Sequence, residues 1–497
     1  MSRDWSSPAE EKVMAPGTAD VESLRRRLDA VGQGHLLNFH DQLPADRRAA
    51  LLDQVAGLEI ESLAELVERY VKNKPAFSLP AGVQPADYYP FDHTSGRRPW
   101  DRDGYRAVGR DLLAAGKVAA FVVAGGQGSR LGYEGPKGCY PAGAVSGRPL
   151  FGMFADQVLA TGRRHGRPIP WYIMTSPLNH EATIEFFREN GFFGLNEADV
   201  MFFPQGVMPS LDIESGKVLM SSPHEIATNP DGHGGSIRAI VGSGALADMK
   251  RRGIEHLSYF QVDNPTVKAL DPVFLGLHAK APDSSGQMSS KMVAKAYPEE
   301  KVGVFCSIGG RTQVVEYSDL PMELQRERLA DGSLRFIAGS IAIHVISVGF
   351  IEKLGTDPSF SLPYHRAEKK IPCIDPRTGA PITPERNNGV KLERFVFDAL
   401  SLCGSGDGRG SIVYETDRVE EFAPIKNAQG ADSPLTSREL QTERAARWLE
   451  RAGVKIPRGP DGKPDCVLEI RATTALDAQD LSGHPIPEIR AGASVVM

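Results

Sequence analysis

Apolar residues along the chain change their spacing near residue 75. Between Asp20 and Asn73 they recur three or four positions apart with charged residues between them, which predicts helices. The residues that carry this pattern are Leu24 with Leu28, then Leu51, Leu52 and Val55, then Leu63, Leu66 and Val67. Prolines, glycines and aspartates dominate from Pro75 to Trp100 and predict an extended connector.

Short apolar runs alternate with amphipathic stretches from Lys117 onward. Strands are predicted at Val118–Ala124, Trp171–Met174, Met201–Phe203 and Leu257–Val262. Helices are predicted near Leu150–Arg164, Glu181–Asn190 and Ile237–Arg251. This alternation indicates an α/β fold, with a parallel or mixed sheet covered on both faces. Ligands of such sheets bind beyond the carboxyl ends of the strands, so the loops at those ends are the ones to examine.

The pattern after Lys291 is mixed. Strands are predicted at Met292–Ala296, Val302–Ser307, Ile341–Ile346 and Cys466–Ile470, with a Gly/Ser-rich break at Gly404–Ser411. We therefore expect a helical N-terminal region and connector (1–100), a central catalytic domain (101–430) and a small C-terminal subdomain (431–497).

Composition narrows the class of protein. Of the 497 residues, 41% are hydrophobic and 24% charged, as in ordinary globular proteins. The net charge of -6 argues against a general nucleic-acid binder, which needs a basic surface. No stretch approaches the roughly 20 apolar residues of a membrane span, and the polar N-terminus from Met1 to Glu11 has no signal-like run.

The five cysteines add a redox argument. They show neither Cys-x-x-Cys pairing nor histidines at zinc spacing, so neither a disulfide framework nor a structural zinc is expected. A reducing compartment fits best, and we expect a cytoplasmic protein with no membrane partner. The sequence leaves the oligomeric state open, a monomer included.

A glycine-rich loop follows the first predicted strand of the central region. Gly125-Gly126-Gln127-Gly128-Ser129-Arg130-Leu131-Gly132 runs on to Pro136-Lys137-Gly138. Glycines let the backbone approach a phosphate, and Arg130 and Lys137 supply positive charge, so the loop is typical of an anion cradle. Leu131 does not fit a dinucleotide fingerprint, and Gly138-Cys139 does not fit a Walker A loop. The alternative is an ordinary tight turn that carries two surface cations.

Asp263 follows the predicted strand Leu257–Val262, which puts its carboxylate at the same edge of the sheet as the glycine loop. A magnesium ion that bridges nucleotide phosphates takes one or two protein carboxylates, so Asp263 is the candidate Mg²⁺ ligand. The alternative is a turn residue that caps the loop before Pro265.

The glycine loop, with Ala124 before it, resembles the signature loop of the UDP-sugar pyrophosphorylases, which are UTP–sugar-1-phosphate uridylyltransferases. The resemblance is greatest to the UDP-N-acetylglucosamine branch. Further similar stretches follow in the same order and cover residues 115 to 430. They are Pro204–Gly206 with Pro209, Pro230–Gly235, Val314–Ser318, Leu362–His365 with Lys369–Pro372, Lys391–Asp398 and Pro424–Asn427.

The resemblance implies a doubly wound, nucleotide-diphospho-sugar transferase sheet and a reaction in which UTP and a sugar 1-phosphate give a UDP-sugar and pyrophosphate. It also implies a role for each matching residue. Those that would contact uracil and ribose are Gly125, Gly126, Gln205 and Gly232. Those that would hold phosphates are Arg130, Lys137 and Lys426, with Mg²⁺ on Asp263. Those of the sugar pocket are His233, Gly234, Glu316, Tyr317, Phe395 and Phe397.

Each of these residues also has a simpler interpretation. Phe395 and Phe397 alternate as one face of a strand does and could belong to the core. Glu316 and Tyr317 could lie on an ordinary sheet edge, Lys426 could be solvated, and Gly232 and Gly234 could only turn the chain.

Three positions depart from the acetylhexosamine pattern. Ser340 and Ile343 stand where the eukaryotic enzymes of that branch usually carry Asn, and the second of these Asn residues touches the sugar. His233 also stands where those enzymes tend to have Asn, whereas glucose-specific relatives have His. We favour N-acetylglucosamine 1-phosphate as the substrate, with glucose 1-phosphate or a broad range of sugars as the alternative.

Two other classes of protein remain as alternatives. One is a non-catalytic nucleotide-sugar-binding protein, which would be expected to lack a phosphate cation or the metal carboxylate. Arg130, Lys137 and Asp263 argue against it. The other is a dinucleotide-dependent oxidoreductase, which Leu131 and the lack of a ribose-binding acid disfavour.

Overall fold

A computed structural model describes residues 21–74, 79–80, 82–357, 362–404 and 408–497. The polar N-terminus lies outside the described residues, as do parts of the predicted connector and of the Gly/Ser-rich break. The chain forms two compact units. The larger comprises the described residues within 78–206, 232–363 and 394–497, and the smaller comprises those within 1–77, 207–231 and 364–393.

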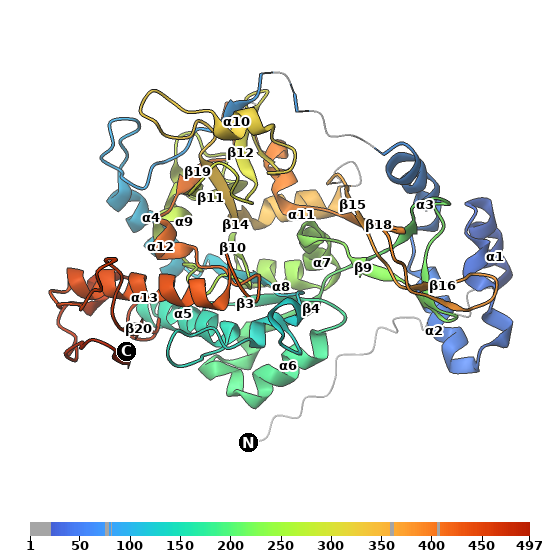
Figure 1. Cartoon of the computed structure of the whole chain (residues 1–497), viewed down its shortest axis with the longest axis horizontal. Coiled ribbons are helices and arrows are strands. Elements are labelled where there is room, and N and C mark those ends of the chain that lie inside the picture. Colours follow the sequence, from blue (N-terminus) through green and yellow to red (C-terminus); the bar gives the residue numbers. More distant parts are fainter. Residues whose placement is uncertain (1–20, 75–78, 81, 358–361, 405–407) are drawn as a thin grey trace. The chain divides into compact units, whose positions relative to one another are not determined.

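The larger unit is built on a mixed sheet, which has ten strands among the described residues (Figure 1). The main path runs through β1 (Gln84–Pro85), β12 (Val304–Ile308), β14 (Ala338–Ser347), β10 (His256–Gln261), β2 (Val118–Val123), β3 (Trp171–Thr175) and β4 (Val200–Pro204). Strands β10, β2, β3 and β4 are mutually parallel, whereas β14 is antiparallel to β10. The side strands are β11 (Met288–Ala294), β13 (Arg311–Val315) and β19 (Val413–Glu415).

Strand β2 shows why helices cover both faces of this sheet. Its six residues are all buried. Alternate residues, such as Ala120, pack with α4 (Arg102–Ala114), α5 (Leu150–His165) and α9 (Pro272–Lys280). The residues between them, such as Phe121, pack with α7 (Ser236–Gly242), α8 (Ala245–Arg252) and α11 (Val348–Thr356). Because side chains alternate along a strand, these two sets define the two faces, and the predicted doubly wound α/β fold is confirmed.

Most predicted elements of the larger unit form close to the predicted bounds. Helix α6 (His180–Glu189) follows β3, and β20 (Val467–Glu469) forms inside the predicted Cys466–Ile470 strand. The region near Ile237–Arg251 is helical as predicted, but it is divided into two helices, α7 and α8. Gly244 lies between them with φ +84°, which a continuing right-handed helix does not allow.

The C-terminal part of the larger unit has its own apolar cluster. Helix α13 (Pro434–Arg451) packs there against β20, which pairs in parallel with β21 (Ser494–Val496). The helix begins with a capping box, in which Ser433 and Thr436 each bond the other's backbone.

The smaller unit confirms the predicted N-terminal helices and adds strands from later in the chain. Helices α1 (Val21–Ala30), α2 (Ala45–Ala56) and α3 (Ile60–Leu66), with a π-helical turn at Val67–Lys72, share one apolar cluster with β6 and β18. Strands β15 (His365–Lys369), β18 (Gly389–Glu393) and β6 (Leu211–Asp212) form an antiparallel sheet. None of the helices in the described residues combines the length and the apolar character that a membrane crossing requires.

Candidate active site

The glycine loop at the end of β2 holds its shape through its own backbone. Lys137 N donates to Gly126 O at 3.0 Å, and Gly128 N donates to Gly135 O at 2.9 Å. These bonds fold residues 126–137 back on themselves, so that Lys137 returns to the point where the loop began. A Cβ on Gly125 would lie 3.1 Å from the side-chain carboxamide carbon of Gln205, so the predicted nucleotide residues Gly125 and Gln205 are neighbours.

Asn179 holds this loop in place through side-chain hydrogen bonds, a role that the sequence did not reveal. Its Nδ2 donates to Ala124 O at 3.0 Å and to Gly126 O at 3.3 Å, while Ser176 N donates to its Oδ1 at 2.7 Å. Asn179 is 1% exposed. It stands just before α6, where an asparagine ordinarily serves as a helix cap, and so no sequence signal marked it.

Asp263 lies level with the glycine loop. Strand β10 pairs in parallel with β2 in a register that puts Gln261 opposite Val123, and Val262 N donates to Val123 O at 3.1 Å. Continuing that register by two residues brings Asp263 beside Gly125. Ile425 N donates to Asp263 O at 2.8 Å, which brings the segment that carries Lys426 to the same edge.

Lys137 interacts electrostatically with charged residues from each of these loops. Burial lowers the pKa of the Lys137 ammonium, the carboxylates of Asp263 and Asp432 raise it, and the cations Lys426 and Arg130 lower it. The lowered pKa means that the carboxylates do not fully compensate the buried charge. The predicted residues Arg130, Lys137, Asp263 and Lys426 therefore form one cluster, which suits a bound polyphosphate.

Asp432 is a member of this cluster that sequence reasoning missed. Its Oδ2 lies 3.5 Å from Lys426 Nζ, and its backbone oxygen accepts hydrogen bonds from the N–H groups of Lys426 and Asn427. Asp432 has φ +54°, a left-handed conformation that Asp tolerates better than most residues. Asp432 closes the segment after Ile425 into a tight loop that carries Lys426. The sequence pattern gave no sign of this role, which is seen only in the structure.

The predicted sugar-pocket residues of two distant segments meet. The His233 ring stacks on Phe395, with centroids 5.1 Å apart and planes 15° apart, and lies 5.6 Å from the Phe397 ring. Val396 N donates to His233 Nδ1 at 3.1 Å, so that nitrogen accepts and the neutral ring carries its proton on the other nitrogen. Phe397 is buried among core residues, as its simpler interpretation expected, while Phe395 packs at the edge of that core.

Two glycines make this meeting possible. Gly234 N donates to Arg394 O at 2.8 Å, and a Cβ on Gly234 would lie 2.7 Å from Arg394 C. Gly232 has φ +84°, in the region that glycine adopts most readily. The packing therefore explains why position 234 is glycine without any contact to a sugar.

Glu316 and Tyr317 lie at the same edge of the sheet but farther along it. Strand β13 ends at Val315, opposite Val304, which in turn lies opposite Gly339 at the start of β14. Because β14 is antiparallel to β10, Gly339 and the residues opposite it lie level with the end of β10. Three strand spacings separate β13 from β10, which is about 14 Å. The charged cluster around Lys137 therefore lies at one place along this edge, and Glu316 lies at another, about three strand spacings away.

Ser340 and Ile343, the departures from the acetylhexosamine pattern, lie on an irregular part of β14. The register between β11 and β14 shifts between the pairs Ser290–His344 and Met292–Ser340, and Ala342 has φ +53°. Bulges of this kind re-aim side chains. Ile343 is 2% exposed and packs in the apolar core, while Ser340 N donates to Gly303 O at 2.7 Å.

The doubly wound sheet, with a glycine loop and a cluster of charged residues at its carboxyl edge, has the arrangement typical of α/β enzymes that bind nucleotides. The family model described as UTP–glucose-1-phosphate uridylyltransferase matches residues 105–440. The chain belongs to this family of uridylyltransferases.

Individual relatives resemble the chain over almost its whole length. A human protein named UDP-N-acetylhexosamine pyrophosphorylase-like protein 1 is 36% identical, over 93% of this chain and 94% of its own. The Saccharomyces cerevisiae UDP-N-acetylglucosamine pyrophosphorylase is 34% identical, over 91% of this chain and 94% of its own. The crystal structure of the Trypanosoma brucei UDP-N-acetylglucosamine pyrophosphorylase in complex with inhibitor has a TM-score of 0.79 and 25% identity, and the match covers 95% of each chain.

Proposed function

We propose that the protein joins UTP and N-acetylglucosamine 1-phosphate, giving the UDP-sugar and pyrophosphate. The observation that carries the reaction is the convergence on Lys137 of charges from three segments, those of Arg130, Asp263 and Lys426. The sugar is supported by the name of the yeast relative, which is 34% identical, and the name of the human relative gives the broader class of N-acetylhexosamines.

The reaction is an in-line displacement. A phosphate oxygen of the sugar 1-phosphate forms a bond to the α-phosphorus of UTP, and the bond from that phosphorus to the oxygen that bridges to the β-phosphorus breaks. Pyrophosphate leaves with that oxygen and its electron pair. Positioning and charge stabilisation supply most of the rate in such transfers, so no nucleophilic residue is needed.

The cluster supplies fixed charge for this step. Lys137 and Arg130 neutralise the charge that develops on the leaving pyrophosphate, and Lys426 holds the attacking phosphate. Lys426 is partly exposed and its ion pair with Asp432 spans 3.5 Å, so a substrate phosphate can compete with that carboxylate.

Asp263 would hold a magnesium ion together with oxygens of the nucleotide. The described residues contain no group of three or more His, Cys, Asp or Glu side chains suited to a metal, so a resident metal cage is not part of the proposal. A single carboxylate beside a phosphate cradle fits Mg²⁺, which typically keeps waters and substrate oxygens as its other ligands. When bound, the ion would supply further neutralisation of phosphate charge.

The proposal also includes the nucleotide and sugar contacts that the family resemblance implies. Gly125, Gly126, Gln205 and Gly232 would contact uracil and ribose. His233, Gly234, Phe395 and Phe397 would line the sugar pocket, with Glu316 and Tyr317 reaching the sugar from the β13 end. A cytoplasmic location also belongs to the proposal and is supported by five free, buried cysteines.

A second candidate is glucose 1-phosphate, or a broad range of sugars. It is supported by His233, and by the apolar, buried Ile343, which offers no hydrogen bond to an acetamido group.

Pyrophosphate release from UTP and Mg²⁺ with a panel of sugar 1-phosphates tests both substrate proposals. We expect the highest kcat/KM with N-acetylglucosamine 1-phosphate. A higher value with glucose 1-phosphate would establish the second candidate, and no release with any sugar would overturn the proposed function.

A further inference from the structure

A cavity of about 380 Å³ lies within the larger unit, and no residue of the glycine loop lines it. It is bounded by α4, α5, α13 and the segment that follows Asp263. No part of the mechanism above uses it. Its volume falls in the range that holds small organic ligands, roughly 300–1,000 Å³.

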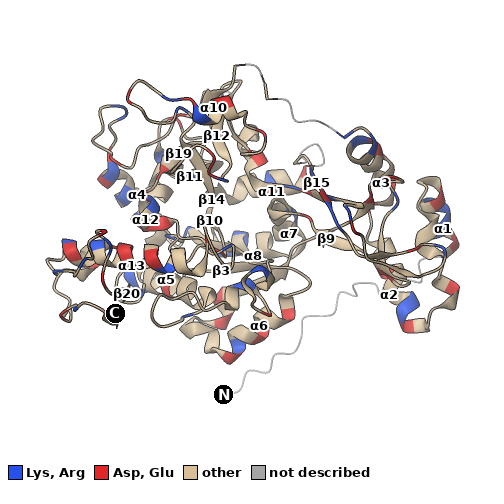
Figure 2. Cartoon of the chain, in the orientation of Figure 1, with Lys and Arg blue, Asp and Glu red and all other residues tan. Residues whose placement is uncertain are grey.

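Two helices direct rows of basic residues into this cavity. From α4 come Arg102, Arg106 and Arg110, spaced four residues apart on one helical face. From α13 come Arg444 and Arg451, on the face that also carries Trp448. Figure 2 shows basic positions in blue on both helices. Lys268 adds a further cation from the segment after Asp263.

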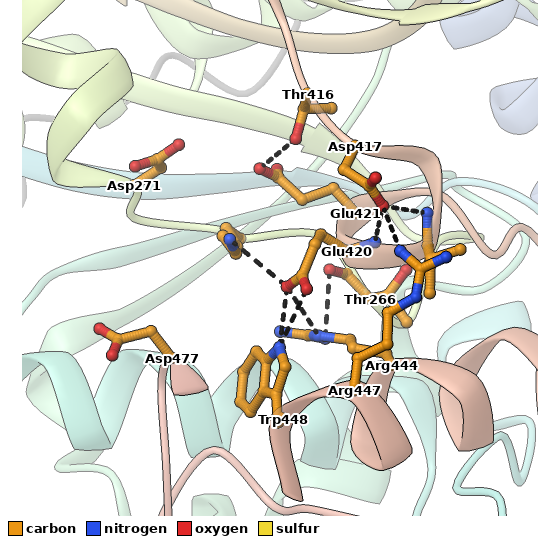
Figure 3. A network of polar contacts seen from close by, with 12 residues as sticks. Thr266, Asp271, Thr416, Asp417, Glu420, Glu421, Arg444, Arg447, Trp448 and Asp477 are labelled. Carbon is orange, nitrogen blue, oxygen red and sulfur yellow. Dashed lines mark hydrogen bonds and ion pairs between the residues drawn. The ribbon is translucent and has the colours of Figure 1, made fainter. Parts of the chain in front are cut away.

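Several of these cations lack full partners among the described residues. Arg110 and Arg451 form no ion pair there, and Arg102 Nε and Arg444 Nε are buried donors without a hydrogen-bond partner. Arg444 and Lys268 share one carboxylate, that of Glu420, at 4.0 and 3.8 Å. Figure 3 shows Arg444 and Trp448 pointing from α13 toward Glu420. Trp448 Nε1 already donates to that carboxylate at 2.9 Å.

The other acids that line the cavity already have partners, among them Glu469, which accepts hydrogen bonds from the N–H groups of Val145 and Ser146, and Asp477, which pairs with Arg164 at 3.3 Å. Asp156 pairs with Arg148 at 2.7 Å and with Arg471 at 3.0 Å. Asp271 and Glu421 both bind the buried Lys291 at 2.6 Å. The cavity therefore has an excess of positive charge from α4 and α13.

Burial makes the positive charge of one of these residues, Arg444, unfavourable. It lowers the pKa of the Arg444 guanidinium, and Glu420 and Glu421 oppose that effect without reversing it. A buried cation of this kind gains from a bound anion that replaces lost hydration.

We propose that this cavity binds a phosphorylated small molecule, whose phosphate accepts hydrogen bonds from the arginines of α4 and α13. Guanidinium groups from two sides match the several acceptor oxygens of one phosphate. The volume leaves room for an attached sugar or nucleoside.

The cavity reaches the segments that carry the catalytic charges. Pro265 and Thr266 line it two and three residues after Asp263, and Glu420 lies six residues before Lys426. Asn264 ties the two segments together, because its Nδ2 donates to Glu421 O at 2.6 Å and its Oδ1 accepts from Ala423 N at 3.1 Å. The cavity and the reaction site are therefore connected through a few residues of the same two segments.

Isothermal titration of the full chain tests the proposal, with glucose 6-phosphate and ATP as probes for a sugar phosphate and a nucleotide. The matched pair of variants is Arg110→Ala/Arg451→Ala, inside the cavity, and Arg163→Ala/Arg438→Ala, which removes the same charge from α5 and α13 outside it. All titrations are repeated in Lys137→Ala, because that change weakens binding of a nucleotide at the glycine loop.

We expect at least one probe to bind, and the cavity variant to weaken it about tenfold, as loss of charge-assisted hydrogen bonds does. The control pair and Lys137→Ala should leave that binding unchanged. The probe that binds more tightly identifies the ligand class. Absence of binding by both probes up to about 10 mM would overturn the proposal. So would equal affinities in the cavity and control variants.

Discussion

At the scale of single residues, Lys137 is the most informative. It is half-buried, it interacts electrostatically with Arg130 and Lys426, and its pKa is lowered chiefly by desolvation. A lysine held in that state would be a poor choice for stability alone, since its charge is less favourable in the folded than in the unfolded protein. A bound polyphosphate would offset this unfavourable free energy, because its negative charge would neutralise the three cations.

Removal of the Lys137 charge should lower turnover with little loss of stability. For Lys137→Ala we expect kcat to fall roughly 100-fold, the scale of one preorganised charge contact. Pyrophosphate release measures it. Lys280→Ala removes an exposed lysine at the end of α9 and serves as the control. Near-normal turnover in a folded Lys137→Ala protein would refute the role.

The lowered pKa of Lys137 also predicts a pH dependence. The charged form is required, so kcat/KM for UTP should decline on the alkaline side at a pH below the ordinary lysine pKa of about 10.4. In Lys137→Arg the decline should move to higher pH, because arginine stays charged. A pH profile that is identical in both proteins would contradict this assignment.

Asn179 should control UTP affinity without touching the nucleotide. Asn179→Ala leaves the Ala124 carbonyl and the Ser176 N–H without their partner and removes one of the two donors to Gly126 O, which costs about 1–3 kcal/mol. We expect a higher KM for UTP and a lower melting temperature, measured by kinetics and thermal unfolding. Asn190→Ala, at the exposed end of α6, is the control. Equal KM values in the two variants would show that Asn179 does not position the loop.

At the scale of elements, the parallel strands and their loops were predictable because local patterns determine them. Strands β2, β3 and β10 lie within about one residue of their predicted bounds, and the glycine loop follows β2 as expected. The helix predicted near Ile237–Arg251 is divided into two, because a right-handed helix cannot continue through Gly244 although the apolar spacing does. Asn179 and Asp432 also escaped prediction, because Asn179 bonds carbonyls of the glycine loop far earlier in the chain and no residue pattern marks the tight loop in which Asp432 meets Lys426.

The contact between the 232–235 and 394–397 segments allows a test at this scale. In Gly234→Ala the new Cβ would overlap the Arg394 backbone, so the two segments must separate and the His233–Phe395 stack must shift. We expect a clear loss of stability and activity. Gly242→Ala is the matched control, because a Cβ there meets nothing within 4 Å. It should be neutral or stabilising by up to about 1 kcal/mol. Similar effects of both changes would contradict the packing argument.

At the scale of the whole molecule, charge is arranged locally. The net charge of -6 gives no hint of an anion site, yet two basic clusters occur in the larger unit, one at the glycine loop and one in the cavity lined by α4 and α13. The division into units was equally hidden, because residues 207–231 and 364–393 join the N-terminal helices. No periodicity in a sequence reports which distant segments pack together.

The central claim is that the β2 loop and the end of β10 act on one triphosphate. A double-mutant cycle of Lys137→Ala and Asp263→Asn, measured as kcat/KM for UTP, tests it most directly. Residues that share a ligand are coupled, so the two effects should deviate from additivity by about 1 kcal/mol or more. Effects that add within about 0.5 kcal/mol would mean that the two residues act independently, and would contradict the account.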